Sequence, residues 1–176
     1  MNLRGRILIA RPNIVDPFFK KGVVFVFEHS AHACAGLVLN KPRKDIGTHD
    51  IMHQRGFTTA NANESLYCGG PVKESAVLMM HTSEWQCSNT LAVTSAISIT
   101  SDDLMIYKYA HGDLPKGYRF FSGQAIWHPQ QIAAEIKANH WLVSEFNEHQ
   151  IFDYTGKDQW TMAVEHNARA TIDKYI

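Results

Sequence analysis

The chain has 176 residues, a length typical of one domain of ordinary size. Its 17 Lys and Arg balance its 17 Asp and Glu, so the formal net charge at pH 7 is zero when the 10 histidines are neutral. Proteins that bind nucleic acid or anionic membranes usually carry a basic excess, and this balance argues against both partners. With 45% hydrophobic and 19% charged residues, the composition is that of a globular protein.

The cysteines and the apolar runs indicate the compartment. Cys34, Cys68 and Cys87 are an odd number at wide spacings, which is poor material for a disulfide framework. The first residues contain no apolar stretch long enough for a signal peptide. The longest uncharged apolar run, Val23 to Phe27, is far shorter than the roughly twenty residues of a spanning helix. We therefore expect a cytoplasmic protein without a membrane segment.

The first third of the chain predicts a helical turn and two strands. Asp16-Pro17 is typical of a turn start, because Asp caps the backbone and Pro tolerates the first helical position. Val23 to Phe27 is apolar at every position, which is typical of a strand buried on both faces. Leu37 to Leu39 predicts a second strand beside it, ending at Asn40. Residues 43–62 predict a loop with one helical turn around His49 to His53.

The middle and the end of the chain add strands and three helices. We expect strands over the following stretches: Leu66 to Cys68, Val77 to His81, Ala92 to Ile99, Tyr118 to Phe121 together with Ala125-Ile126 as one strand, Trp141 to Val143 and Ile151 to Phe152. We expect helices from Ser101 or Asp102 to Ala110, from Gln130 to Asn139 and from Gln159 to about Arg169.

Strands outnumber helices and do not alternate regularly with them. This pattern favours an α+β fold over a doubly wound one. We expect one compact domain over residues 1–176, with a mixed, strongly curved or barrel-like β-sheet flanked by a few helices.

Several short motifs together resemble the AlgH/YqgE family of bacterial proteins over residues 1–165. The motifs are Leu8 to Pro12, Asp16-Pro17 with Phe19, Glu28-His29, Gly36 to Pro42, Gly69 to Val72, His81, Thr100-Ser101 with Asp103, Trp127 with Gln131 and Glu135-Ile136, and Asn139 with Trp141-Leu142. The resemblance implies a compact cytoplasmic α+β domain in a family whose biochemical function is uncharacterised. The family's label as a transcriptional regulator is a name to which the balanced charge lends little support.

The chain also departs from the family pattern at positions that bear on function. Arg11 stands where the family tends to have Met, and Ile126 and Gln130 stand where it has Gly. Ala133 replaces a Glu, so a site that used this carboxylate is lost, whereas Arg11 adds a hydrogen-bond donor and indicates a changed site.

The Glu28-His29 pair gives the first candidate site. Neighbouring side chains on a regular strand point to opposite faces, so the two cannot address one substrate together. Either can line a pocket at the end of the strand, with Asn40 arriving from the neighbouring strand, and serve as a general acid or base. In the structural alternative, which we favour, the pair satisfies backbone groups of the following loop.

Two further patterns allow chemistry but are better explained by structure. His29, His32 and Cys34 are zinc-ligand types, but their spacing is loose and we expect no metal. Cys68 beside two glycines resembles a nucleophile near an oxyanion site, although a small buried residue is the simpler interpretation. No motif indicates a cofactor.

The remaining candidates are a turn and a tryptophan. Gly69-Gly70-Pro71 predicts a tight turn at the border of a pocket, and it lacks the Lys-Ser/Thr of a phosphate-binding loop. Trp127 is a core anchor for the helix that follows it, and any exposed edge of it is the first place to look for a partner surface.

Two functions remain open. The first is a binding module, with a possible regulatory role, that recognises a small ligand or a protein through Glu28, His29, Asn40, the Gly69-Gly70-Pro71 turn, His81 and Trp127. The second is a hydrolase or acid–base enzyme that uses His29, Glu28 or His81. Binding leads, because the chain supplies no matched nucleophile and base. We expect no direct nucleic-acid binding, and the sequence fixes neither the ligand nor the oligomeric state.

Overall fold

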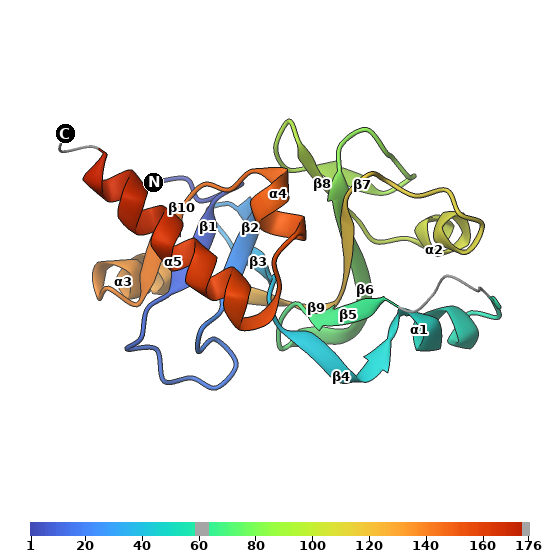
Figure 1. Ribbon diagram of the computed structural model, residues 1–176, viewed down its shortest axis with the longest axis horizontal. Helices are drawn as coiled ribbons and strands as arrows, with labels where there is room; N and C mark the ends of the chain where they lie inside the picture. Colours follow the sequence, from blue (N-terminus) through green and yellow to red (C-terminus); the bar gives the residue numbers. More distant parts are fainter. Residues whose placement is uncertain (59–63, 174–176) are drawn as a thin grey trace.

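The computed structural model describes residues 1–58 and 64–173 (Figure 1). The strands are β1 (Ile7–Ala10), β2 (Val23–His29), β3 (Cys34–Val38), β4 (Pro42–Gly47), β5 (Ser65–Cys68), β6 (Val72–Thr82), β7 (Thr90–Ala92), β8 (Ile97–Thr100), β9 (Tyr118–Trp127) and β10 (Trp141–Ser144). The helices are α1 (Thr48–Gln54), α2 (Asp103–Ala110), α3 (Pro129–Lys137), α4 (Glu148–Phe152) and α5 (Gly156–Ile172).

The strands form one strongly curled sheet in the order β10-β1-β2-β3-β9-β6-β8-β7 (Figure 1). All of these neighbours are antiparallel, whereas β5 adds to β9 in parallel and β4 pairs with β5. The expected α+β fold with a mixed, strongly curved sheet is therefore confirmed, as is the pairing of the two strands around Phe25 and Leu37.

Helices cover both faces of the sheet. One face, formed by residues such as Leu8, Val24 and Cys34, packs against α3 through Ile132. The opposite face, which includes Phe25, packs against α4 and α5. A third cluster joins β6 and β9 to α1 and α2 at the other end of the molecule (Figure 1). No helix in the described ranges is long and apolar enough to span a bilayer.

The structure corrects three local predictions. Residues 92–99 form a hairpin instead of one strand, because the Thr94 hydroxyl accepts hydrogen bonds from the backbone N–H groups of Ala96 and Ile97 and closes a turn. The expected loop after residue 43 contains β4, whose polar side chains hid its pairing with β5. Ile151 and Phe152 end α4 rather than a strand, since Asn147 caps that helix. The part of the expected loop over residues 59–63 lies outside the described residues.

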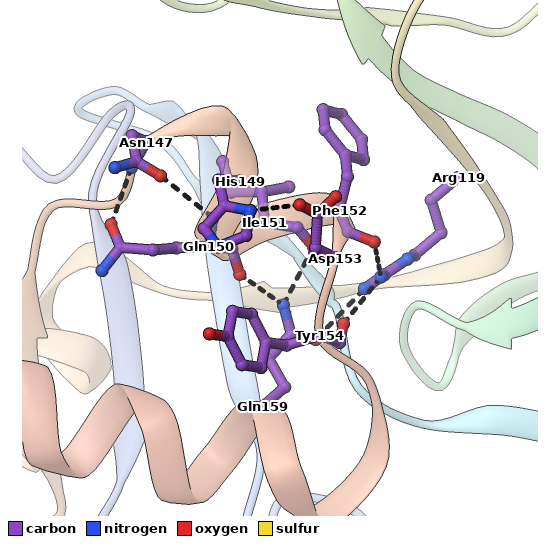
Figure 2. Close-up of polar contacts among 9 residues, drawn as sticks. All are labelled: Arg119, Asn147, His149, Gln150, Ile151, Phe152, Asp153, Tyr154 and Gln159. Carbon is purple, nitrogen blue, oxygen red and sulfur yellow. Dashed lines mark hydrogen bonds and ion pairs between the residues drawn. The ribbon is translucent and has the colours of Figure 1, made fainter.

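A buried arginine fastens α4 and α5 to the sheet (Figure 2). Arg119 on β9 is 6% exposed, and its guanidinium donates to the carbonyl oxygens of Leu39, Phe152 and Tyr154 and to the side-chain oxygen of Gln159, at 2.8–3.1 Å. Gln159, fully buried on α5, in turn donates to two carbonyl oxygens of α4. Burial lowers the pKa of Arg119.

Candidate functional site

His29 lies on the face of the sheet that α3 covers. A β-bulge just before Glu28 shifts the register, so that His29 pairs with Cys34, which pairs in turn with Trp127 on β9. Residues that are directly opposite share a face, and the bulge therefore turns His29 toward α3. The His29 Nδ1 accepts the backbone N–H of Leu3 at 3.0 Å, and Glu28 is exposed. The imidazole holds the N-terminal segment against the sheet.

Asn40 does not lie near His29. Because β3 runs antiparallel to β2, the end of β3 lies beside the start of β2, at the opposite end from His29. The buried Asn40 side chain accepts the N–H of Val23 and donates to the carbonyl oxygens of Lys21 and Gly156, at 2.8–2.9 Å. These bonds join the start of β2 to the start of α5, which is a structural role.

The glycine turn makes a close backbone crossing. An added Cβ at Gly69 would lie 2.4 Å from the carbonyl oxygen of Gly123, and one at Gly70 would lie 1.8 Å from the carbonyl carbon of Gln124. Both glycines are buried against β9, whereas Pro71 is exposed. Gly69 and Gly70 are therefore required by packing.

His81 lies far from Trp127. It pairs with Tyr118 at the start of β9, whereas Trp127 ends the same strand, roughly 30 Å away along an extended chain. The fully buried ring bonds through Nδ1 to the Thr82 carbonyl oxygen and through Nε2 to the Thr100 hydroxyl, both at 2.9 Å. Burial lowers its pKa, so the imidazole is neutral at pH 7.

None of the three cysteine thiols is activated as a nucleophile, and the described residues form no metal site. Burial raises the pKa of Cys34 to about 11 and also raises the pKa values of Cys68 and Cys87, so all three are protonated thiols at pH 7. Within residues 1–58 and 64–173, no group of three His, Cys, Asp or Glu side chains is arranged to hold a metal ion.

Trp127 leads to the most promising cavity. Its side chain is buried, 3% exposed, and packs with Ile132 as the core anchor expected for α3. Beside it lies a pocket of about 300 Å³ that we call the aromatic pocket, lined by residues including Asp16, Phe19, Trp127, Gln131, Glu135, His140 and Trp141. The pocket thus lies between the β1–β2 connection, α3 and the start of β10.

Three aromatic rings that contact one another line the aromatic pocket. The ring centroids of Phe19 and Trp127 are 5.4 Å apart, those of Phe19 and Trp141 5.7 Å, and those of the two tryptophans 6.1 Å. Phe19 is the least buried of the three. It is held by the turn expected at Asp16, whose carboxylate accepts the backbone N–H groups of Phe18 and Phe19.

Glu135 is the polar centre of the aromatic pocket. One carboxylate oxygen accepts from the Gln131 amide at 2.9 Å, one helical turn earlier, and the other accepts from the indole N–H of Trp141 at 2.8 Å. Asn139, at φ +58, reverses the chain between α3 and β10 and brings Trp141 back to Glu135. Hydrogen bonds thus fix the carboxylate in place.

Charge distinguishes this pocket. Its lining includes the carboxylates of Asp16 and Glu135 and no Lys or Arg. No ion pair in the described part of the chain involves Glu135. A half-buried carboxylate beside aromatic side chains attracts a cation by its charge.

The motifs already contained the signal for this site. Five residues of the pocket belong to three separate motifs in the sequence: Phe19, Trp127, Gln131, Glu135 and Trp141. Of these five, the sequence alone indicates only Trp127 as a candidate. The spacing of Gln131 and Glu135 places them on one face of a helix, but the convergence of that face with Phe19 depends on the sheet.

Comparison with known proteins agrees with this description. The family model DUF179, described as AlgH-like, matches residues 7–170. A UPF0301 protein of Actinobacillus pleuropneumoniae is 30% identical over 170 residues, covering 93% of this chain and 91% of its own length. A UPF0301 protein of Photorhabdus laumondii is 30% identical over 169 residues, covering 93% and 90%.

Two solved structures are similar. The solution structure of the AlgH protein from Pseudomonas aeruginosa has a TM-score of 0.82 at 25% identity and covers 94% of this chain and 88% of its own. The crystal structure of a protein from Corynebacterium diphtheriae has a TM-score of 0.75 at 23% identity, covering 94% and 87%. Since the family model spans nearly the whole chain, this protein belongs to the AlgH-like family.

Proposed function

We propose that this protein is a binding module that recognises a positively charged group, an ammonium or guanidinium on a small ligand or a protein, in the aromatic pocket. The observation that carries the proposal is the Glu135 carboxylate, held by Gln131 and by the Trp141 indole beside an aromatic cluster, in a pocket whose lining includes no Lys or Arg. The proposal involves no chemical step, since the pocket contains no nucleophile with a paired base.

A second indole–carboxylate pair in the same chain supports a positively charged ligand. The indole N–H of Trp85 donates to Asp113 at 2.9 Å, as that of Trp141 does to Glu135. At Trp85 the chain supplies its own cation, because the Lys108 ammonium lies 4.8 Å from the ring centroid and 3.1 Å from the Asp113 carboxylate. The Trp141–Glu135 pair has the same groups and opens on a pocket.

The acid–base alternative has less support. His29 and Asn40 lie at opposite ends of the β2–β3 pair, and both ring nitrogens of His81 are engaged. A cytoplasmic site of action agrees with the three free cysteines.

The Trp141 indole N–H provides a direct assay. In ¹H–¹⁵N spectra, choline is expected to shift this resonance with a Kd in the millimolar range, which corresponds to about 4 kcal/mol. The neutral isostere 3,3-dimethyl-1-butanol is expected to bind at least tenfold more weakly. The Trp85 indole, which already has Lys108, is expected to stay unmoved and serves as the internal control.

Two carboxylate variants complete the test. Glu135→Gln keeps an oxygen that accepts from the Trp141 indole, removes the charge and is expected to weaken choline binding at least tenfold. Glu28→Gln removes an exposed carboxylate outside the pocket and is expected to leave binding within twofold. Equal binding of choline and its neutral isostere, or an unchanged Kd in Glu135→Gln, would refute the proposal.

A further inference from the structure

β10 forms one end of the sheet, and no strand of the described residues pairs with its outer side. Backbone bonds fix which groups face outward. The Arg11 N–H donates to the His140 carbonyl oxygen, so His140 and Leu142 face β1, whereas Trp141 and Val143 face away from it. The Asn167 side chain reaches the Val143 carbonyl oxygen at 3.4 Å from the outer side, in agreement with this direction. The edge therefore presents the N–H and C=O of Trp141 and the N–H of Val143 to a further strand, which would displace the Asn167 amide from the Val143 carbonyl oxygen.

A groove runs along this edge. It has a volume of about 640 Å³ and is lined by the stretch from Trp141 to Glu145, by Ile136 of α3 and by residues of α5, and its basic side chains are Arg6 and His166. The volume lies in the range of ligand-binding clefts, and residues of two helices border it.

The groove and the aromatic pocket share Trp141. In an antiparallel pair, residues directly opposite each other send their side chains to the same face. The Trp141 side chain points to the face covered by α3, where Glu135 accepts its indole N–H. A peptide residue opposite Trp141 therefore points toward Glu135, and its backbone N–H and C=O both face Trp141.

We infer that the edge of β10 binds an extended peptide as an additional antiparallel strand, with a Lys or Arg opposite Trp141 whose cation enters the aromatic pocket. The inference rests on the proposed function, because the pocket supplies the charge complementarity that selects a basic residue. The backbone bonds supply affinity and the pocket supplies specificity, which is the usual division in strand addition.

Backbone methylation of a peptide tests the pairing directly. The probe is an acetylated and amidated seven-residue peptide of alternating threonine and valine with lysine at its centre, measured by fluorescence anisotropy and by shifts of the Trp141 indole. N-methylation of the lysine and of the residue two positions before it removes the N–H groups that face Trp141 and Val143 and is expected to weaken binding at least tenfold. N-methylation of the two residues adjacent to the lysine is the matched control and is expected to change binding less than twofold.

Two further measurements separate this inference from the proposed function. Replacing the lysine by norleucine is expected to weaken binding at least tenfold. Val143→Pro removes one outward N–H at an edge position that tolerates proline and is expected to weaken peptide binding at least fivefold while choline binding stays unchanged. The methylated peptides give their answer on the unmodified protein even if this variant fails to fold.

Each contrary outcome has a distinct meaning. If choline and the lysine peptide bind but the two methylation patterns are equivalent, strand pairing is wrong and the cation pocket stands. If norleucine and lysine peptides bind equally, the inference fails, and the choline titration alone decides the proposed function. If the protein forms a concentration-dependent dimer that protects the amides of Trp141 and Val143 and that the peptide does not disrupt, the edge pairs with a second copy and the inference is overturned.

Discussion

Replacing Arg119 with methionine is expected to destabilise the protein by about 4 kcal/mol. The guanidinium donates four hydrogen bonds, three of them to the backbone carbonyl oxygens of Leu39, Phe152 and Tyr154. It also lies 4.4 Å from the centroid of the Tyr67 ring. Methionine fills much of the same space but leaves the carbonyl groups without donors, and each unsatisfied buried acceptor costs about 1–3 kcal/mol. The expected loss of about 4 kcal/mol is smaller than three such costs near the middle of this range, because removing a buried charge also recovers the cost of its desolvation.

Urea denaturation followed by tryptophan fluorescence measures this loss. For a chain of this size, about 4 kcal/mol corresponds to a decrease in Tm of roughly 12 °C. The matched control is Arg4→Met, because Arg4 is exposed and donates to a single carbonyl oxygen, and its expected cost is below about 1 kcal/mol. Hydrogen exchange is expected to rise first in α4, which Arg119 and Gln159 hold. A loss below about 1 kcal/mol for Arg119→Met would show that the guanidinium network does not fasten the helices.

Three other predictions follow from buried groups. Gly70→Ala places a Cβ 1.8 Å from the carbonyl carbon of Gln124 and is expected to abolish soluble expression, whereas Gly47→Ala, with its nearest contact at 3.4 Å, is expected to express normally. Burial lowers the pKa of His81, so in mild acid the unfolded state binds a proton that the folded state does not. The free energy of unfolding is therefore expected to fall as the pH drops from about 6.5 toward the lowered pKa. Urea titrations at pH 7.5 and 5.5 measure this change, which is expected to be smaller in His81→Gln. Because burial raises the pKa of Cys34 to about 11, iodoacetamide at pH 8 is expected to label this thiol in urea at least a hundredfold faster than in the native protein.

Each of these has a clear contrary result. Soluble, folded Gly70→Ala would mean that the crossing with β9 can open without cost. An identical pH dependence in His81→Gln would assign the acid sensitivity to other groups. Rapid native labelling of Cys34 would mean that the sheet opens locally at this position.

The strands with strong local patterns were predictable, and those formed by pairing were not. Val23 to Phe27 is apolar at every position and is β2, and Asp102 caps α2 as expected, since its carboxylate accepts the Met105 N–H. By contrast, β4 has an exposed, polar sequence and exists because it pairs with β5. The local pattern also did not show that β2 and β3 run antiparallel. The prediction that Asn40 lies near His29 was wrong because this orientation puts the two residues at opposite ends of the strand pair.

The candidate site followed the same rule. Trp127 was singled out from its position before α3, and it does border the aromatic pocket. Glu135 was recognisable only as one residue of a motif, because its importance comes from the Trp141 indole that the turn at Asn139 brings back to it. Convergence between distant segments is a property of the sheet, and no local pattern encodes it.

The place of β10 beside β1 has a consequence for how the protein folds during synthesis. Ala10 pairs with Trp141, so roughly 130 further residues are synthesised after β1 before its partner strand β10 is available. Their synthesis takes on the order of 10 s on a ribosome. A shorter delay, of roughly 90 residues, applies to β3, because Cys34 pairs with Trp127 on β9. Until then the apolar strands at the start of the chain have unpaired edges, and long-range pairing of this kind is slow. The nascent chain is therefore expected to depend on chaperones until β9 and β10 have emerged.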